Sequence, residues 1–531
     1  RWQSIKFFKM ERRNRNLSER RGFENYSSRC QARTPQVRNS SFRKSHSQSF
    51  LKSDLKNDNF SVIFQQFLNG DFAGFLERVI FLIRSMFLIF IVNPCVRIYE
   101  SVKADNKKRL NLEGFEKIRK HRANYMLFLF ICLLLLIGLV VMFSLSPQRA
   151  NSLNIAKGAN YDDYYFFWRH LIYIAVGLVF FFGMKAIPLN WIFSKSLQFF
   201  IFSLILCVAL AGLALFNLPP VICENGACRW FGFSGFSFQQ AEFLKIGVIL
   251  LLSTFLGAQA SKGKINSYKE TILPASVVII AVLLVIAGFQ KDLGTATTII
   301  IAIAFQFIIA GMKSKKLIPI GALVLVGVVL LIVFEPHRIS RILTFSSGDC
   351  SNILTESGKD QYHICNAKLA IGSGGVLGLG IGNSVQSAGY LPETINDSIF
   401  AVMGEMFGFV GLIFIIAIYF GLFYQLLVII SKMENPASRL FVAGVAGWLA
   451  SQTIINIAAM VGLFPLKGIT IPLISYGGTS LVVILTVLGA VFNISNYTSF
   501  TQVEDFKEEG NENIGSRRRV GRSRSSNRGS F

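Results

Sequence analysis

Long apolar runs, separated by polar stretches, recur along the chain between residues 124 and 497. A run of about 20 apolar residues is long enough to cross the hydrocarbon core of a bilayer as a helix. The pattern therefore predicts an all-α, polytopic membrane protein of ten transmembrane helices, with a large extracytoplasmic loop between helices seven and eight. The predicted spans are residues 124–146, 165–185, 191–216, 240–258, 271–289, 293–311, 316–334, 398–430, 436–463 and 470–495.

Basic residues lie in every second connection between these spans, and those connections are short. Short cytoplasmic loops carry an excess of lysine and arginine, so the pattern places both termini in the cytoplasm. The basic residues of the inner connections are Lys185, Lys262, Lys264, Lys269, Lys313, Lys315, Lys316, Lys432 and Arg439. Asp397, which ends the long polar stretch before the eighth span, then faces the outside.

The two ends of the chain are polar and basic. Residues 1–60 are rich in Arg, Ser and Asn and predict a disordered cytoplasmic region. Residues 61–123 predict a juxtamembrane region, whose apolar stretch 79–92 is interrupted by Arg84 and fits an interfacial helix better than a spanning one. Residues 498–531 predict a disordered Arg/Ser-rich tail. Nucleic-acid binding is the rival interpretation of this tail, but we expect no such partner.

The composition agrees with a membrane protein and removes several enzyme classes. The 531 residues are 52% hydrophobic and only 16% charged, with a formal net charge of +24. Such values are unusual for a soluble domain of this size. No HExxH, GxxxxGKS, paired CxxC or Ser/His/Asp signature occurs, so ATP hydrolysis and metalloprotease chemistry lack their usual residues.

Four of the eight cysteines fall in pairs in predicted outer loops. An oxidising compartment favours the disulfides Cys223–Cys228 and Cys350–Cys365, and four free thiols are the alternative.

Several polar side chains lie at the depth of the bilayer, where they are costly unless paired or functional. Glu242 and Lys245 share one helix face, which fits either a structural ion pair or a functional site. Glu405 lies two turns into the eighth span, near the face that Asp397 begins. The spacing of Gln452 and Asn456 suits interhelical hydrogen bonds as well as substrate contact.

A glycine-rich run at residues 372–382 precedes the polar stretch that ends in Asp397. Close backbone packing is one interpretation, and an anion-binding nest for a diphosphate is another. Arg338 and Arg341, one helical turn apart at the outer end of the seventh span, suit such an anion better because guanidinium groups match phosphate oxygens.

Five motifs between about residues 125 and 495 resemble the SEDS (shape, elongation, division and sporulation) proteins, which polymerise peptidoglycan from lipid II. The motifs are GACRW at 226–230, QQAEFLK at 239–245, QKDLGTA at 290–296, the stretch 370–400, and PLISYGGTS at 472–480. The segments NSVQ and YLPE look like the division (FtsW-like) branch of the family rather than the elongation branch.

The family's catalytic acid belongs to a Thr-Asp-Phe-Ile-Phe-Ala motif, and the matching residue here is Asp397. The chain departs from the motif, since Asn396 replaces Thr, Ser398 replaces Phe, and Ile395 stands where His is frequent. Further on, Met406 takes the place of a second Glu, while Gln240 and Lys291 stand where Pro is common. No histidine is therefore expected beside the acid.

The resemblance implies a peptidoglycan glycosyltransferase that builds glycan strands during cell division, with a role in cell wall biogenesis and cell shape. Asp397 is the expected general base, and lipid II and an undecaprenyl-diphosphate-linked glycan are the expected substrates. The residues expected to bind substrate are Arg229, Trp230, Glu242, Lys245, Arg338, Arg341, Gln386, Glu393 and Ser475. A divalent cation, Mg or Mn, is expected to assist.

Expected partners are a class B penicillin-binding protein and other division proteins, and the expected location is the cytoplasmic membrane of a bacterium with an extracytoplasmic site. Two other functions remain open. In a lipid II flippase, Glu242, Lys245 and Glu405 would line a path and Asp397 would act as an exit gate. A non-catalytic division scaffold would need neither Asp397 nor the outer basic residues.

Overall fold

The computed structural model of the protein describes residues 123–216, 221–224, 227–233, 236–319, 321, 322, 327, 359–465 and 468–498. The predictions for the basic ends, for most of the seventh span, and for Arg338 and Arg341 lie outside these residues. The described part is helical except for one small sheet. Its helices and strands are α6 (Tyr125–Lys157), α7 (Tyr165–Ala186), α8 (Leu189–Ser194), α9 (Ser196–Leu215), β1 (Val221–Glu224), β2 (Ala227–Phe233), β3 (Phe236–Phe238), α10 (Gln240–Ser261), α11 (Leu273–Leu283), α12 (Leu293–Ile309), α15 (Lys359–Ser373), α16 (Ile399–Lys432), α17 (Pro436–Met460) and α18 (Gly478–Ile494).

Eight helical segments of the described residues are long and apolar enough to cross a membrane, and α12 is a shorter apolar helix. One of the eight combines α11 with π-helical turns at Tyr268–Ile272 and Leu284–Phe289. The predicted class, a helical polytopic membrane protein, is thereby confirmed. The number ten and the position of the large loop stay predictions, because residues 328–358 lie outside the described part.

Two predicted span boundaries are wrong. The first helix continues through Pro147 to Lys157, although the sequence predicted a loop from residue 147. The last helix begins at Gly478, so that residues 470–477 form a loop that precedes it. Both errors concern polar or glycine-containing segments next to apolar runs, where hydrophobicity alone does not define the helix end.

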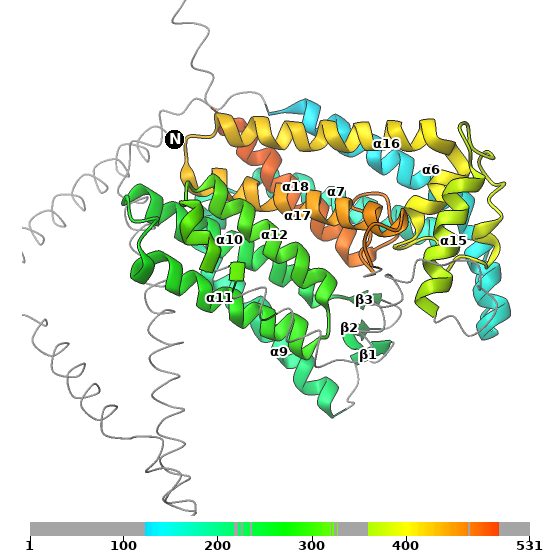
Figure 1. The fold of residues 1–531 in the computed structure, drawn as a ribbon, viewed down its shortest axis with the longest axis horizontal. Helices are drawn as coiled ribbons and strands as arrows, with labels where there is room; N and C mark the ends of the chain where they lie inside the picture. The colour runs from blue at the N-terminus through cyan, green and yellow to red at the C-terminus, as the bar shows by residue number, and fades with distance from the viewer. Residues whose placement is uncertain are drawn as a thin grey trace, which may run out of the picture. The chain divides into compact units, whose positions relative to one another are not determined.

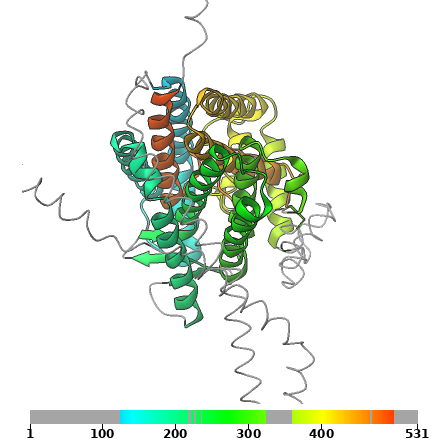
Figure 2. The same cartoon turned by 90° about the vertical axis from the view of Figure 1, so that its left-hand side faces the viewer.

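The helices α10 and α17 are almost wholly buried in the described part, whereas α6, α7 and α9 expose many apolar side chains. α10 packs against both α9 and α17, α12 packs against α17, and α7 packs against α18. α16 packs against both α6 and α17, and α15 packs against α16 at the end where α16 begins (Figure 1); Figure 2 gives the perpendicular view. The polar side chains of α10 and α17 therefore lie in the interior of the bundle.

A three-stranded antiparallel sheet, in the order β1-β2-β3, lies in the connection between α9 and α10. The apolar pattern of the sequence predicted no strand there. Cys223 and Cys228 are cross-strand partners in the β1–β2 pair and form a disulfide, which confirms that predicted bridge. The Cys350–Cys365 bridge stays a prediction, because Cys350 lies outside the described residues.

The glycine-rich run packs its backbone directly onto α16. Gly408 interrupts α16 with φ 66° and ψ −170°, and the run supplies hydrogen bonds on both sides of this break. Leu379 N and Gly380 N donate to the carbonyls of Glu405 and Met406 at 2.9 and 3.0 Å. Phe409 N and Val410 N donate to Gly375 O and Val376 O at 2.9 and 3.1 Å. Close packing, rather than an anion nest, accounts for these glycines.

Gly374 tests this packing, because a Cβ atom at this position would lie 2.0 Å from the carbonyl oxygen of Gly404. We expect Gly374→Ala to destabilise the protein by about 1–3 kcal/mol, the usual cost of overpacking a filled interior. Gly183→Ala is the matched control, since nothing lies within 4 Å of the added Cβ. Thermal unfolding of detergent-solubilised protein measures both variants. Equal midpoints for the two variants would contradict the close approach.

Candidate active site

Asp397 lies in the loop that leads into α16, and its main chain is held from other elements. Asn456, on α17, donates from Nδ2 to Asp397 O at 2.7 Å and to Ile469 O at 2.6 Å. Tyr476 N donates to Ile395 O at 2.8 Å. These bonds join the Asp397 loop, α17 and the loop before α18 into one assembly. The acid therefore sits at a fixed point between three chain segments.

The carboxylate of Asp397 lines a small pocket together with Ile455, Asn456, Ala459, Met460, Gly468 and Ile469. Its Oδ1 atom is buried and has no hydrogen-bond partner among the described residues. Burial raises the pKa of this carboxyl to about 7, and the negative charge of Glu393 also raises it. Backbone amides and Arg149 act in the opposite direction. A group with this pKa exchanges protons readily near neutral pH.

Glu393 shapes the same loop. Its backbone has φ 49°, which is uncommon for a residue other than glycine. Its carbonyl accepts from Asn396 N at 3.0 Å and Ser398 N at 3.2 Å, and its carboxylate pairs with Arg149 of α6 at 3.3 Å. The Glu393 side chain is 46% exposed, so it remains accessible to a substrate.

Glu405 lies on α16 and organises the stretch before Asp397. Its buried carboxylate accepts from Ser384 Oγ at 2.5 Å, Val385 N at 2.9 Å and Gln386 N at 3.3 Å. Gln386, predicted to contact substrate, is itself buried, and its Oε1 has no hydrogen-bond partner among the described residues. Glu405 is thus a structural anchor in this geometry, because several donors already satisfy its charge.

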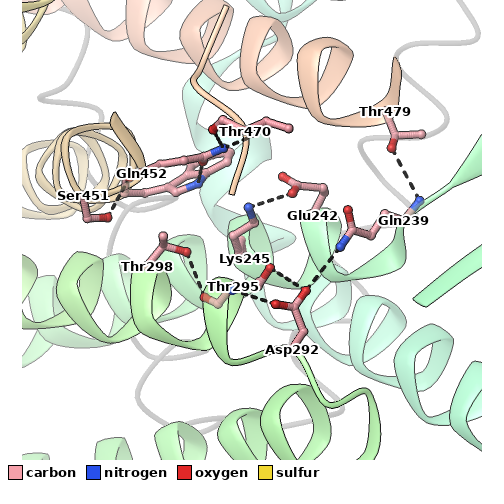
Figure 3. A network of polar contacts seen from close by, with 11 residues as sticks. Gln239, Glu242, Lys245, Asp292, Thr295, Thr298, Ser451, Gln452, Thr470 and Thr479 are labelled. Atoms are coloured by element: carbon pink, nitrogen blue, oxygen red, sulfur yellow. Dashed lines mark hydrogen bonds and ion pairs between the residues drawn. The ribbon is translucent and has the colours of Figure 1, made fainter. Parts of the chain in front are cut away.

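A second polar network connects α10, α12 and α17 (Figure 3). Lys245 Nζ lies 2.8 Å from Glu242 Oε1 and 4.8 Å from the centroid of the Trp448 ring. Trp448 Nε1 donates to Gln452 Oε1 at 2.9 Å, and Gln452 Nε2 donates to Thr470 O at 2.9 Å. Because Thr470 follows Ile469, the network ends beside the Asp397 pocket. Glu242 and Lys245 form a buried ion pair, which offers little exposed charge to a substrate.

The other predicted substrate residues have backbone partners. Arg229 donates to Gln290 O at 3.3 Å and Lys291 O at 2.8 Å, so it ties the sheet to the start of α12. Trp230 lies in β2 opposite Ile222. Ser475 Oγ accepts from Ile471 N at 2.9 Å and closes a turn next to Tyr476. The structure thus brings Asp397, Glu393 and the Ser475 turn together, and places Arg229 and Trp230 in the small sheet.

Comparison with known proteins identifies the family. A model of the cell cycle proteins that groups FtsW, RodA and SpoVE matches residues 124–500. The chain belongs to the FtsW/RodA/SpoVE family. The resemblance inferred from the five sequence motifs is therefore confirmed.

Members of the FtsW/RodA/SpoVE family match over most of their length. Stage V sporulation protein E of Bacillus subtilis (strain 168) is 30% identical over 385 residues, 72% of this chain and 99% of the relative. A protein of the same strain named probable peptidoglycan glycosyltransferase FtsW is 32% identical over 395 residues, 72% of this chain and 93% of the relative. The fold resembles a solved structure described as "Structural coordination of polymerization and crosslinking by a peptidoglycan synthase complex", with TM-score 0.54, 22% identity, and coverage of 70% of this chain and 97% of that one.

Three residues near the acid were not predicted as parts of the site. Arg149 follows the first predicted span, in a connection that the charge pattern places outside. Basic residues are less common in outer connections, and this could have marked Arg149 as a candidate for the site. Asn456 was noted only for its spacing. The expectation that no histidine lies near the acid is wrong, since His363 Nε2 lies 2.5 Å from Ser398 Oγ.

The divalent cation predicted for this family stays a prediction. The described residues contain no group of three or more His, Cys, Asp and Glu side chains that could hold a metal ion. Mg²⁺ is often held by one or two carboxylates together with substrate phosphates rather than by a protein cage.

Glu405→Gln tests the anchor. A glutamine has one acceptor oxygen where glutamate has two. Its NH2 group is a donor, so it cannot accept the hydrogen bonds that the N–H groups of Val385 and Gln386 donate to Glu405. We expect a loss of about 1.5–3 kcal/mol, the range for hydrogen bonds to a charged group. Thermal unfolding measures the loss, and proteolysis of the 383–397 loop should accelerate. Glu434→Gln, at an exposed site, is the control. If the unfolding midpoint and the proteolysis rate of the 383–397 loop are unchanged in Glu405→Gln, Glu405 does not anchor the loop.

Proposed function

We propose that the protein is a peptidoglycan glycosyltransferase that polymerises lipid II at the outer face of the cytoplasmic membrane during cell division, with Asp397 as general base. The names of its FtsW relatives support the reaction class. The observation that carries the proposal is the Asp397 carboxylate itself. It has a buried oxygen with no hydrogen-bond partner among the described residues and a pKa near neutrality, its carbonyl is held by Asn456, and it lines a pocket.

The chemistry follows from these properties. Ionised Asp397 removes the proton from the 4-hydroxyl of the acceptor sugar as that oxygen attacks C1 of the donor. A bond forms between the acceptor oxygen and C1, while the bond from C1 to the diphosphate breaks and undecaprenyl diphosphate leaves with the electron pair. Attack from the opposite side inverts the α-linked donor to a β-1,4 linkage. Asn456 and Tyr476 N fix the loop, which keeps the base aligned.

The diphosphate leaving group needs positive charge, and the candidates differ in how they support this role. Lys245 is paired with Glu242 and buried, which argues against direct contact in this geometry. Arg149 lies near Asp397 but already pairs with Glu393. Arg338 and Arg341 remain the predicted diphosphate ligands.

The flippase alternative receives less support. A flippase would need free polar groups along a path, whereas Glu242 pairs with Lys245 and several donors hold Glu405. The fold match to a peptidoglycan synthase complex is consistent with the proposed partner, a class B penicillin-binding protein. The proposed orientation keeps both termini in the cytoplasm and Asp397 outside.

Asp397→Asn tests the base. The substitution preserves shape and the main-chain bonds but removes the proton acceptor, so we expect no detectable glycan chains from labelled lipid II. The assay uses purified protein with its partner transpeptidase and a divalent cation, and gels resolve the products. Membrane insertion and thermal stability should match the wild type. Chains from the variant would exclude Asp397 as base, and lipid II scrambling that survives the substitution, without chains from either protein, would favour the flippase.

The dependence of rate on pH tests the environment of the base. The ionised form is active, so the rate should rise as pH increases through about 7, the pKa of Asp397. Glu393→Gln removes a negative neighbour and frees the Arg149 charge, and both changes favour ionised Asp397. We therefore expect the midpoint to move to lower pH. Asp162→Asn, at an exposed position, should leave it in place. A midpoint that moves upward would contradict the assigned electrostatics.

A further inference from the structure

His363 of α15 makes a polar contact with the residue that follows the acid. Ser398 is fully buried and lies between Asp397 and the first residue of α16. Its hydroxyl lies 2.7 Å from Pro392 O and 2.5 Å from His363 Nε2. The serine therefore bridges the two ends of the turn 392–398 and also connects the turn to α15.

The partners of the hydroxyl define where its hydrogen goes. A carbonyl oxygen only accepts, so the single hydrogen of Ser398 Oγ is donated to Pro392 O. The serine oxygen then has lone pairs left, and His363 Nε2 must donate to it. This assigns the hydrogen to Nε2 of His363, by the logic of the hydrogen-bond network. Both the neutral Nε2–H tautomer and the imidazolium ion supply this donor.

The contact completes a ring of restraints around the acid. Asn456 of α17 holds the Asp397 carbonyl, Tyr476 N holds Ile395, and Arg149 of α6 holds Glu393. His363 supplies the link to α15, which packs against α16.

We propose that His363 is a positioning residue for Asp397, which acts by donating a hydrogen bond from Nε2 to Ser398 and thereby holds the turn 392–398 against α15. This role rests on the proposed function, since it serves the same reaction. It requires a donor at this position and no proton transfer by the imidazole. Glu393 and Arg149 are charged groups that shift the pKa of Asp397, the first upward and the second downward.

Four variants separate a positioning role from the alternatives. His363→Ala removes the donor and should lower kcat about 10- to 100-fold with KM nearly unchanged, because small misplacements of a reacting group are costly. His363→Gln restores an N–H at comparable reach and should recover most of the rate. Ser398→Ala should match His363→Ala, and the double variant should be no slower than either single one, since both act through one bond.

Leu369→Ala is the matched control on α15, because this side chain is 54% exposed. Its rate should equal that of the wild type. The pH midpoint of His363→Gln should also equal the wild-type value. If His363→Gln is as slow as His363→Ala, the imidazole acts by titration and the proposal fails. If His363→Ala keeps the full rate, or if the effects of the two single variants multiply, the proposal also fails.

Hydrogen–deuterium exchange of the amides in residues 394–399 gives a readout that does not depend on activity. Exchange should be faster in His363→Ala and Ser398→Ala than in the wild type, and normal in His363→Gln. If the wild type makes no glycan chains, the proposed function fails, while the exchange data still report whether His363 holds the turn. If chains form but exchange and rate are unchanged in His363→Ala, the function stands and the positioning role is excluded.

Discussion

The side-chain amide of Asn456 is the interaction on which the candidate site depends. Through one nitrogen it binds the carbonyls of Asp397 and Ile469, two residues that lie in different loops. Neither loop has regular secondary structure at this point, so its carbonyls need a partner from elsewhere. α17 is buried and rigid, and it supplies that partner at the required depth. One side chain of α17 thus holds two of the chain segments that line the pocket, at Asp397 and at Ile469.

A second polar side chain of α17 holds the loop before α18 in the same way. Gln452 lies one turn before Asn456 on α17 and binds the residue after Ile469. The side-chain oxygen of Gln452 accepts a hydrogen bond from the Trp448 ring nitrogen, and the ammonium group of Lys245 lies over the Trp448 ring. A buried lysine would be costly alone, but the ion pair with Glu242 and the aromatic face compensate for its desolvation. The loop before α18 is therefore supported from the centre of the bundle, and the pair can affect the site without contact with the substrate.

The sequence predicted the parts that follow from simple physical rules. Apolar run length predicted most spans, and Asp397 stood out because an acid between a polar loop and an apolar helix is costly. The β-sheet was missed because its strands are short and lie in a connection. His363 and Arg149 were missed for a different reason, since residues 35 and 244 positions away from their partners come together only in the fold. The spacing of Glu242 and Lys245 correctly predicted that they share a helix face and can pair, but it did not predict that the pair is buried.

The break at Gly408 has a mechanical consequence for the protein in its bilayer. A helix of fixed length accommodates a change in membrane thickness by tilting, by kinking or by a local change in the bilayer, and the long part of α16 is subject to this constraint. The short part before the break begins after Ser398, the residue that follows Asp397. It is attached by main-chain bonds to the glycine-rich run and by the Glu405 side chain to residues 384–386. The glycine-rich run bonds to α16 on both sides of the break, so the two parts of the helix are held at one angle. A change in the tilt of the long part would therefore be passed to the short part and to the run, rather than absorbed at Gly408.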